Sequence, residues 1–403
     1  MIRIGLIGKT NTGKTTFFNS ATLLSAKIST YPFTTIEPNI GTAYVRSLCV
    51  CKEMNVKDNP KNSACVDGWR FIPIELIDLP GLIKGSWKGK GLGTQFLSVA
   101  SQADALIHIV DASGSVDENG KLIKTGMGNP VLDVYDVEEE LTLWFTSLIT
   151  RNLKTVLKHV KKGISSDGAL SEFLAGLKVT HKHVKNALNE PNLEGKSIEQ
   201  WNDNDVKVFS KRIRELSKPT VIMANKMDLS HSSDNCAKLV DEFKEYFVIP
   251  SCSEAELALR MAEKKGLIRY IPGEEKFKVL DKEGLTKDQV RALNYVQQRV
   301  LSRWINTGVQ FALNICVFKL LRMNSVYPVE DANRLSDKKG NVLPDVLLAP
   351  HDADIFNLAS QIHTDLAKNI LFAVDARTGL RLPTDYIIKD RDMISITSAA
   401  KKK

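Results

Sequence analysis

Long hydrophobic runs are missing from this sequence. None of its 403 residues belongs to an apolar run near the ~20 residues that a membrane-spanning helix needs. Met1 directly precedes the apolar segment Ile2 to Ile7, which leaves no room for a secretory or transit segment. These two absences predict a cytoplasmic protein that has no membrane partner.

Acidic residues are fewer than basic ones. The 47 Asp and Glu residues are outnumbered by 55 Lys and Arg residues, so the net charge is +8. A basic balance favours an anionic partner, and RNA is the one that we expect, whereas DNA is not. Generic surface lysines that serve solubility alone are the alternative explanation of the same charge.

Cysteine is sparse, with six residues: Cys49, Cys51, Cys65, Cys236, Cys252 and Cys316. In a cytoplasmic chain we expect free thiols rather than disulfides. Cys49, Cys51 and Cys65 are close enough in sequence to share a zinc ion, but the sequence offers no evident fourth ligand. Reduced cysteines with a structural role, in an insertion between two strands, are therefore preferred over a metal site.

The most informative segment that is present is Gly8-Lys9-Thr10-Asn11-Thr12-Gly13-Lys14-Thr15, directly after the apolar run Ile2 to Ile7. This is the pattern of a strand followed by a phosphate-binding loop, whose glycines let backbone N–H groups point at nucleotide phosphates. Lys14 can reach the β- and γ-phosphates, and the Thr15 hydroxyl can hold Mg²⁺. A helix from Lys14 to about Ala26 would present its positive N-terminus to the same anion. The predicted phosphate contacts are Gly8, Lys9, Thr10, Asn11, Thr12, Gly13, Lys14, Thr15 and Thr16.

A second motif, Asn225-Lys226-Met227-Asp228, follows the apolar stretch Thr220 to Ala224. The Asp228 carboxylate can accept two hydrogen bonds from the N1–H and the amino group of guanine, a donor pair that adenine lacks. The aliphatic part of Lys226 can cover one face of the base, and Asn225 can tie this loop to the phosphate-binding loop. Downstream, backbone N–H groups of Ser251, Cys252 and Ser253 are predicted to contact the guanine O6.

Two further segments match the switch regions of a nucleotide-dependent protein. Asp78-Leu79-Pro80-Gly81 ends an apolar strand, so that Asp78 can join the outer shell of Mg²⁺ and the Gly81 N–H can bind a γ-phosphate. Upstream, Thr35 is the predicted second hydroxyl ligand of Mg²⁺, and its neighbour Thr34 is the alternative. Lys14, Thr35 and Gly81 are accordingly the candidate catalytic residues.

With these motifs in order, the chain resembles GTPases of the Obg-like superfamily. The segments Tyr31 to Thr35 and Asp78 to Gly93 resemble the YchF-related branch most, and Val326 to Asp331, Lys339 to Asp345 and Ile362 to Leu366 look like a TGS domain, a ubiquitin-like β-grasp module. The resemblance implies a protein that hydrolyses GTP to GDP and phosphate, with Mg²⁺, as a translation- or ribosome-associated switch. The ribosome, or tRNA or rRNA, is the implied partner. An ATP-preferring hydrolase, or an RNA- or ribosome-binding module with negligible turnover, are the alternatives.

One departure concerns the attacking water. Small signalling GTPases carry a glutamine after the position of Gly81, but this chain has Leu82, which cannot form a hydrogen bond through its side chain. In several GTPases that lack this glutamine, an asparagine at the position of Asn11 helps to hold K⁺ between the phosphates. Asn11 therefore suggests K⁺ as an additional cofactor, and a loop-bracing role is the alternative.

The expected fold class is α/β: a P-loop domain with a mostly parallel sheet, a helical insertion and a C-terminal β-grasp domain. Strands are predicted at 2–7, 42–50, 71–77, 105–111, 220–224 and 247–249, and helices within 131–216. The predicted domains are 1–112 with 219–270 for the P-loop domain, 113–218 for the insertion, 271–310 for a helical connector and 311–399 for the TGS domain. Residues 311–317 are expected to be the first strand of that last domain.

Overall fold

The computed structural model describes residues 1–23, 38–81, 85 and 101–399. Two compact units make up the chain: the first comprises residues 1–43 and 75–316, and the second comprises residues 44–74 and 317–403. Residues 44–74, which the sequence analysis placed in the P-loop domain, thus associate with the C-terminal part of the chain. Among the described residues, no helix combines the length and the hydropathy that crossing a membrane requires.

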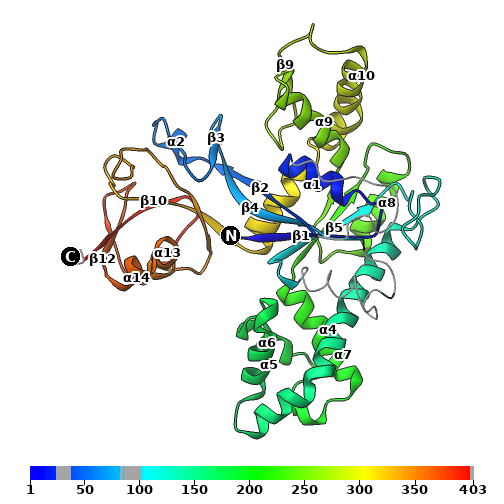
Figure 1. Cartoon of the computed structure of the whole chain (residues 1–403), viewed down its shortest axis with the longest axis vertical. Coiled ribbons are helices and arrows are strands. Elements are labelled where there is room, and N and C mark those ends of the chain that lie inside the picture. The colour runs from blue at the N-terminus through cyan, green and yellow to red at the C-terminus, as the bar shows by residue number, and fades with distance from the viewer. Residues whose placement is uncertain (24–37, 82–84, 86–100, 400–403) are drawn as a thin grey trace. The chain divides into compact units, whose positions relative to one another are not determined.

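The chain forms a seven-stranded sheet, of which β1, β5, β6 and β7 belong wholly to the first unit (Figure 1). Its strand order is β2-β4-β1-β5-β6-β7, with β3 added beside β4, and β1, β4, β5, β6 and β7 pair in parallel. Every residue of β5 and β6 is buried, as expected for parallel strands covered on both faces. The strands are β1 (Arg3–Ile7), β2 (Asn39–Leu48), β3 (Ala64–Val66), β4 (Trp69–Asp78), β5 (Ala105–Asp111), β6 (Thr220–Asn225) and β7 (Val248–Pro250).

Three helices of the first unit bring their N-terminal ends to the loops that follow these strands. They are α1 (Lys14–Thr22), α8 (Ser232–Glu242) and α9 (Ser253–Lys264). Helix α1 buries Phe17 and Phe18 completely, which fixes it in the core. The parallel pairing places the C-terminal ends of β1, β4, β5 and β6 at one edge of the sheet, which is where open α/β sheets bind ligands.

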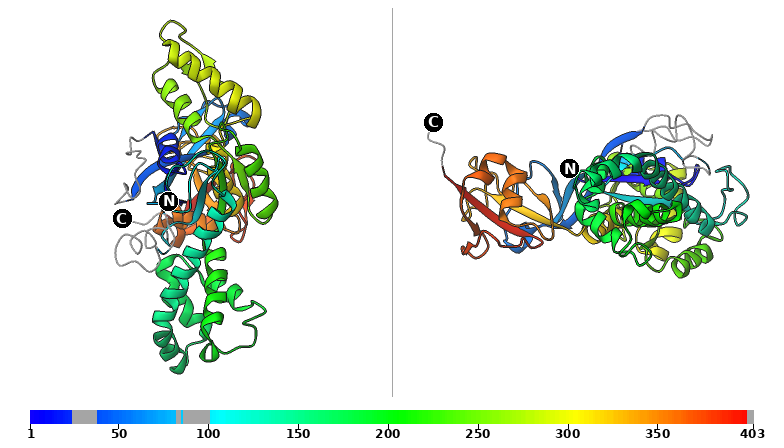
Figure 2. Two further views of the ribbon diagram at one scale, coloured as in Figure 1. Left: turned by 90° about the vertical axis from the view of Figure 1, so that its right-hand side faces the viewer. Right: turned by 90° about the horizontal axis from the view of Figure 1, so that it is seen from below.

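A helical arm, residues 130–217, is inserted between β5 and β6. It contains α4 (Pro130–Lys161), α5 (Ser166–Leu174), α6 (His181–Leu188) and α7 (Asp203–Ser217), and Figure 2 shows α4 and α7 running side by side. Helix α4 starts with Pro130 behind the capping side chain of Asn129. Apolar residues of the arm at helical spacing, including Phe145, Ile149, Phe209 and Ile213, form a hydrophobic cluster that continues into the sheet at Ile7, Ile77 and Leu106.

The prediction of a strand at residues 311–317 is wrong. This segment is helical, in α12 (Val309–Asn314) and a following π-helical segment (Ile315–Leu320). Ala312, Leu313, Cys316 and Val317 are all buried, a spacing that suits one face of a helix. A short apolar run does not distinguish a strand from a buried helix by periodicity, which explains the error.

The second unit contains a five-stranded mixed sheet in the order β11-β10-β14-β12-β13. Strands β10 (Met323–Val329) and β14 (Asp392–Ser398) pair in parallel at its centre, and β11 (Leu347–Pro350), β12 (Ile370–Asp375) and β13 (Arg381–Leu382) pair antiparallel around them. Helices α13 (Ile355–Ile362) and α14 (Thr364–Lys368) complete this part. Leu358 of α13 belongs to the same buried hydrophobic cluster as Val326 of β10 and Ile394 of β14. The assignment of this domain to the TGS class stays a prediction.

Candidate functional site

The loop Gly8–Gly13 connects β1 to α1 and encloses the Lys14 side chain. The Lys14 Nζ atom donates to the backbone oxygens of Gly8 at 3.1 Å and Lys9 at 2.6 Å. Burial lowers the pKa of Lys14 to about 8, and the nearby Asp78 carboxylate opposes this shift. Gly13 has a φ of 103°, and a Cβ there would lie 2.3 Å from the Asn225 amide nitrogen, so only glycine fits. The loop therefore has the curled form that a phosphate-binding loop requires.

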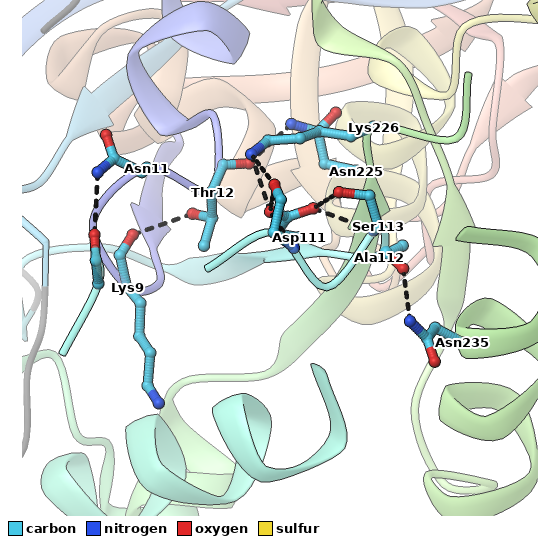
Figure 3. A network of polar contacts seen from close by, with 11 residues as sticks. Lys9, Asn11, Thr12, Asp111, Ala112, Ser113, Asn225, Lys226 and Asn235 are labelled. Atoms are coloured by element: carbon cyan, nitrogen blue, oxygen red, sulfur yellow. Dashed lines mark hydrogen bonds and ion pairs between the residues drawn. The ribbon is translucent and has the colours of Figure 1, made fainter. Parts of the chain in front are cut away.

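Two residues of this loop make contacts that the sequence analysis did not anticipate. The Lys9 Nζ atom lies 2.7 Å from a carboxylate oxygen of Asp133 and 2.7 Å from one of Asp136, both on α4. Its side chain thus points away from the predicted phosphate site, although its backbone oxygen still accepts from Thr12 Oγ1 (Figure 3). The Asn11 amide group donates to the backbone oxygen of Gly120 at 2.9 Å.

The predicted magnesium residues Thr15 and Asp78 lie together. The register of β1 with β4 pairs Leu6 with Asp78, which brings the end of β4 beside the loop. Thr15 Oγ1 donates to Asp78 Oδ2 at 2.8 Å, and the Asn39 amide donates to the same oxygen at 3.3 Å. Asp78 is fully buried, burial raises its pKa, and its Oδ1 atom has no hydrogen-bond partner within the described part of the chain. The remaining predicted ligand, Thr35, lies outside the described residues, as do Thr34 and Leu82.

Gly81 packs directly on the phosphate-binding loop. A Cβ at Gly81 would lie 2.4 Å from Thr10 Oγ1, so a larger residue would displace the loop. Thr10 Oγ1 is itself buried, with no hydrogen-bond partner among residues 1–23, 38–81, 85 and 101–399. Two of the segments predicted to bind phosphate and Mg²⁺, Gly8–Thr15 and Asp78–Gly81, are therefore adjacent.

Beside this loop lies a pocket of about 240 Å³ that contains most of the predicted base-binding residues. Asn225 is one of its lining residues. Its amide nitrogen donates to the Thr12 backbone oxygen at 2.8 Å, and its amide oxygen accepts from the Ser253 N–H at 3.0 Å. The predicted link from Asn225 to the phosphate-binding loop is thus confirmed. The lining residues are Gly13, Thr16, Asn225, Lys226, Asp228, Leu229, Cys252, Ser253 and Glu254.

Both carboxylate oxygens of Asp228 are held by neighbouring side chains. The Cys252 thiol donates to Oδ1 at 3.1 Å, and the Tyr295 hydroxyl donates to Oδ2 at 3.3 Å. Tyr295 comes from α10 (Lys287–Val296), more than sixty residues along the chain, and no sequence motif could have identified it. Burial and the Asp228 charge raise the pKa of Tyr295, so its hydroxyl remains a donor at neutral pH.

Asp111 is a second residue that the sequence analysis missed. It ends β5, and its carboxylate accepts from the backbone N–H and hydroxyl groups of Ser113 and Ser115. Its Oδ2 atom also lies 2.9 Å from Lys226 Nζ (Figure 3). The Lys226 side chain therefore reaches from the end of β6 to the end of β5. The ion pair holds its aliphatic part, which was predicted to cover the base, in one orientation. The position of Asp111 at the end of a buried strand was the available signal.

The contact of the 251–253 backbone with guanine O6 stays a prediction, and the three N–H groups concerned have protein acceptors in this structure. The Ser251 N–H donates to Ala224, the Cys252 N–H donates to Thr307, and the Ser253 N–H donates to the Asn225 side chain. Each of the three amides thus already has a protein acceptor. The sequence could not show this, because Thr307 is distant in the chain.

Comparison with known proteins agrees with this geometry. A protein-family model described as 50S ribosome-binding GTPase matches residues 3–135, which include the phosphate-binding loop and Asp78. A second model, Obg-like GTPase YGR210-like, G4 motif-containing domain, matches residues 223–331, which include Asn225 and Asp228. An uncharacterized GTP-binding protein of Methanocaldococcus jannaschii is 42% identical over 401 residues, covering 100% of both chains. The chain belongs to the Obg-like GTPase family.

Other members of the Obg-like family show how far the likeness extends. A crystal structure of a GTP binding protein from Pyrococcus horikoshii covers 99% of this chain and is itself covered completely, with 33% identity and a TM-score of 0.79. The ribosome-binding ATPase YchF of Bacillus subtilis is 28% identical over 72% of this chain and 74% of its own length. The predicted α/β fold and the relationship to the YchF branch are thereby confirmed.

Proposed function

We propose that this chain binds GTP and hydrolyses it to GDP and phosphate, as a switch that works on the ribosome. The proposal is carried by one observation: the pocket that holds the Asp228 carboxylate is joined to the phosphate-binding loop through Asn225. A base in that pocket and a phosphate chain along Gly8–Thr15 would belong to one nucleotide. The matching family descriptions and the names of the relatives support the same assignment.

Guanine is the base that suits the pocket. Asp228 presents two acceptor oxygens, and the N1–H and amino groups of guanine supply two donors. Guanine binding would take over the positions of the Cys252 thiol and the Tyr295 hydroxyl, or share the carboxylate with them. Adenine offers no such pair, so it would leave the carboxylate to its present partners without a compensating gain.

Mg²⁺ is the metal that the residues fit. Thr15 supplies a hydroxyl oxygen, and Asp78 supplies a buried carboxylate with one unpaired oxygen, which suits a hard cation that prefers oxygen ligands. When bound, the ion would neutralise charge on the β- and γ-phosphates. Lys14 would leave the backbone oxygens of Gly8 and Lys9 and donate to the same phosphates. Thr35 and the Gly81 N–H would contact the triphosphate form and release it after hydrolysis.

Potassium is proposed as a further cofactor through Asn11. Asn11 belongs to the phosphate-binding loop, and a carboxamide oxygen at this position is a group that would ligate a cation beside the phosphates. Such a charge would take the role that an arginine finger has in other GTPases. Equal rates of hydrolysis in K⁺ and Na⁺ buffers would remove K⁺ from this proposal.

An ATP-preferring hydrolase is the second candidate, because the Bacillus subtilis relative is named an ATPase. The motif Asn225 to Asp228 is intact here, which favours GTP. Competition binding of GTP and ATP to the wild type decides between the two. Release of phosphate, measured with and without ribosomes, separates a hydrolase from a binding module with negligible turnover.

The ribosome is proposed as the partner on the basis of the family description, the net charge of +8 and the C-terminal domain. Co-sedimentation with ribosomes in the presence of GDP or a non-hydrolysable GTP analogue tests it. We expect more protein in the ribosomal pellet with the analogue than with GDP. Equal amounts with both nucleotides would argue against a nucleotide-dependent switch.

A further inference from the structure

Three cysteines and one aspartate of the second unit converge on one point. Their ligand atoms all lie within 4.8 Å of one another, and they come from the connection between β2 and β4: Cys49, Cys51, Asp58 and Cys65. The sequence alone shows no evident fourth ligand beside the three cysteines, which disfavours a metal site. Asp58 is that missing ligand, brought in by the fold.

We propose that these four side chains bind one Zn²⁺ ion, which holds this connection in its folded form. Three sulfur ligands and one carboxylate oxygen are a donor set that suits zinc, whereas Mg²⁺ and Ca²⁺ prefer oxygen alone. The site lies outside the nucleotide pocket and does not depend on the nature of the nucleotide. It is therefore a structural site rather than a catalytic one.

The distances agree with a tetrahedral ion. Zinc at about 2.3 Å from each sulfur would hold two sulfur ligands about 3.8 Å apart. The Sγ atoms of Cys51 and Cys65 are 3.8 Å apart, and Cys49 Sγ lies 3.3 Å from Asp58 Oδ2. Since no pair of ligand atoms is more than 4.8 Å apart, the widest pair would have to close by about 1 Å. Rotation of the side chains can supply that movement.

The local backbone explains why the sulfurs meet. Asp67 and Gly68 both have positive φ, 51° and 86°, which is the turn that closes a tight hairpin between β3 and β4. This hairpin places Cys65 opposite Arg70. The Cys49 N–H donates to the Gly68 oxygen at 2.8 Å, so the segment that carries Cys49 and Cys51 is tied to the same turn.

Arg70 supports the carboxylate ligand from behind. Its guanidinium is completely buried and donates to Asp58 Oδ2 at 2.8 Å, which orients the carboxylate toward the three cysteines. The same guanidinium donates to the backbone oxygens of Leu343 at 2.6 Å and Pro344 at 3.3 Å. Three thiolates and a carboxylate around Zn²⁺ carry a net charge of −2, which the buried arginine reduces to −1.

A further buried donor faces the site. The hydroxyl of Tyr327 is buried and interacts with Cys49 and with the backbone of Val50, and the Arg70 guanidinium lies 5.6 Å from the centre of its ring. A hydroxyl in that position can donate to a zinc-bound thiolate, as groups around structural metal sites commonly do.

The proposed ion would stabilise the contact between the 49–66 connection and residues 342–346. Asn59 donates through its backbone to Val342 at 2.8 Å, and Lys61 donates to Pro344 at 2.8 Å. Asn59 directly follows the ligand Asp58, and Lys61 is two residues further along the chain. Fixing Asp58 on the metal would therefore fix the start of the segment that pairs with the C-terminal domain.

The test measures metal content of the full chain, purified under reducing conditions without added metal. We expect about one zinc per chain by mass spectrometry of the metal. After removal with a chelator, titration with Co²⁺ should give the visible absorption and thiolate charge-transfer bands of a tetrahedral sulfur-rich site. This spectrum needs no variant, so it does not depend on whether a substituted chain folds.

Variants then assign the ligands. Cys65→Ser and Cys51→Ser should weaken Zn²⁺ binding about tenfold or more. Cys236→Ser is the matched control, because Cys236 and Cys51 are both 6% exposed but Cys236 lies in α8, in the first unit. The control should keep the full zinc content and the Co²⁺ spectrum. The proposal is overturned if the reduced wild type binds neither metal, if Cys65→Ser binds zinc as tightly as the wild type, or if the purified protein contains a Cys51–Cys65 disulfide instead.

Discussion

Replacement of Asp228 by asparagine should change the preferred nucleotide from GTP to XTP. The carboxylate lies in the pocket with both oxygens oriented by the Cys252 thiol and the Tyr295 hydroxyl. Guanine presents two donors to it. Asparagine keeps one acceptor oxygen and replaces the other by an NH₂ group, which would face the guanine amino group as donor against donor.

The size of the effect follows from the hydrogen bonds that are lost. A hydrogen bond to a charged acceptor contributes about 1.5–3 kcal/mol, and an unsatisfied donor costs about 1–3 kcal/mol. Asp228 is half-buried and must share or release its present partners, so we take the lower part of the summed range, about 2.5–4 kcal/mol. GTP binding should then weaken roughly 70- to 900-fold. Xanthine carries an oxygen in place of the amino group, which accepts from the new NH₂ group, so XTP should bind the variant more tightly than GTP does.

Competition against a fluorescent GTP analogue, with GTP, XTP and ATP, measures the three affinities on the wild type and on Asp228→Asn. Asp241→Asn on α8 is the control, because it removes the same charge from an exposed position. Thermal unfolding of each chain shows that it is folded. A folded Asp228→Asn chain that binds GTP within about threefold of the wild type, or that gains nothing toward XTP, would refute the placement of the base.

Three further changes test the rest of the site. Gly13→Ala should abolish nucleotide binding, because the new Cβ would lie 2.3 Å from the Asn225 amide nitrogen and the backbone φ there is 103°. A filter-binding assay measures this, and retained binding would contradict the loop geometry. GTP binding should weaken as the pH rises above about 8, by up to about tenfold per unit, because the free Lys14 loses its proton there and phosphate binding requires the charged form. Calorimetry in two buffers of different ionisation enthalpy should show proton uptake on binding above that pH, and none well below it. Asp78→Asn, in a chain that keeps Thr15, should raise the Mg²⁺ concentration for half-maximal hydrolysis about tenfold or more. An unchanged Mg²⁺ titration would exclude Asp78 from the metal site.

Sequence patterns predicted the parts of the site that are local in the chain. Gly8 to Thr15 follows a strand and precedes a helix, and both flanking elements are set by residues next to the motif. Asn225 was predicted to reach back to the loop, since β1 and β6 lead their loops to one edge of the sheet, and its bond to Thr12 confirms this. Such predictions succeed because parallel strands bring their C-terminal ends together irrespective of what lies between them.

Contacts made by insertions could not be predicted in the same way. The Tyr295 hydroxyl on α10 donates to Asp228, and the Thr307 backbone oxygen accepts from the Cys252 N–H. Both contacts depend on the path of the chain after α9, which the hydrophobic periodicity of the sequence does not predict. Asp58 likewise becomes a metal-ligand candidate only when the β3–β4 hairpin folds, since the sequence spacing Cys49, Cys51, Cys65 contains no signal for a carboxylate.

The pairing of Lys9 with α4 gives the helical arm a direct link to the phosphate site. Lys9 is 2% exposed, and its ammonium group has carboxylate partners on α4 at Asp133 and Asp136. The backbone oxygen of the same residue accepts from Lys14, the side chain that must move to reach a phosphate. Under the proposed binding mode, a nucleotide would therefore break a hydrogen bond at Lys9, whose side chain is fixed to the arm. A buried lysine is costly unless its charge is compensated, and Asp133 and Asp136 of the arm supply this compensation for Lys9. The helical arm therefore stabilises the phosphate-binding loop through this pairing.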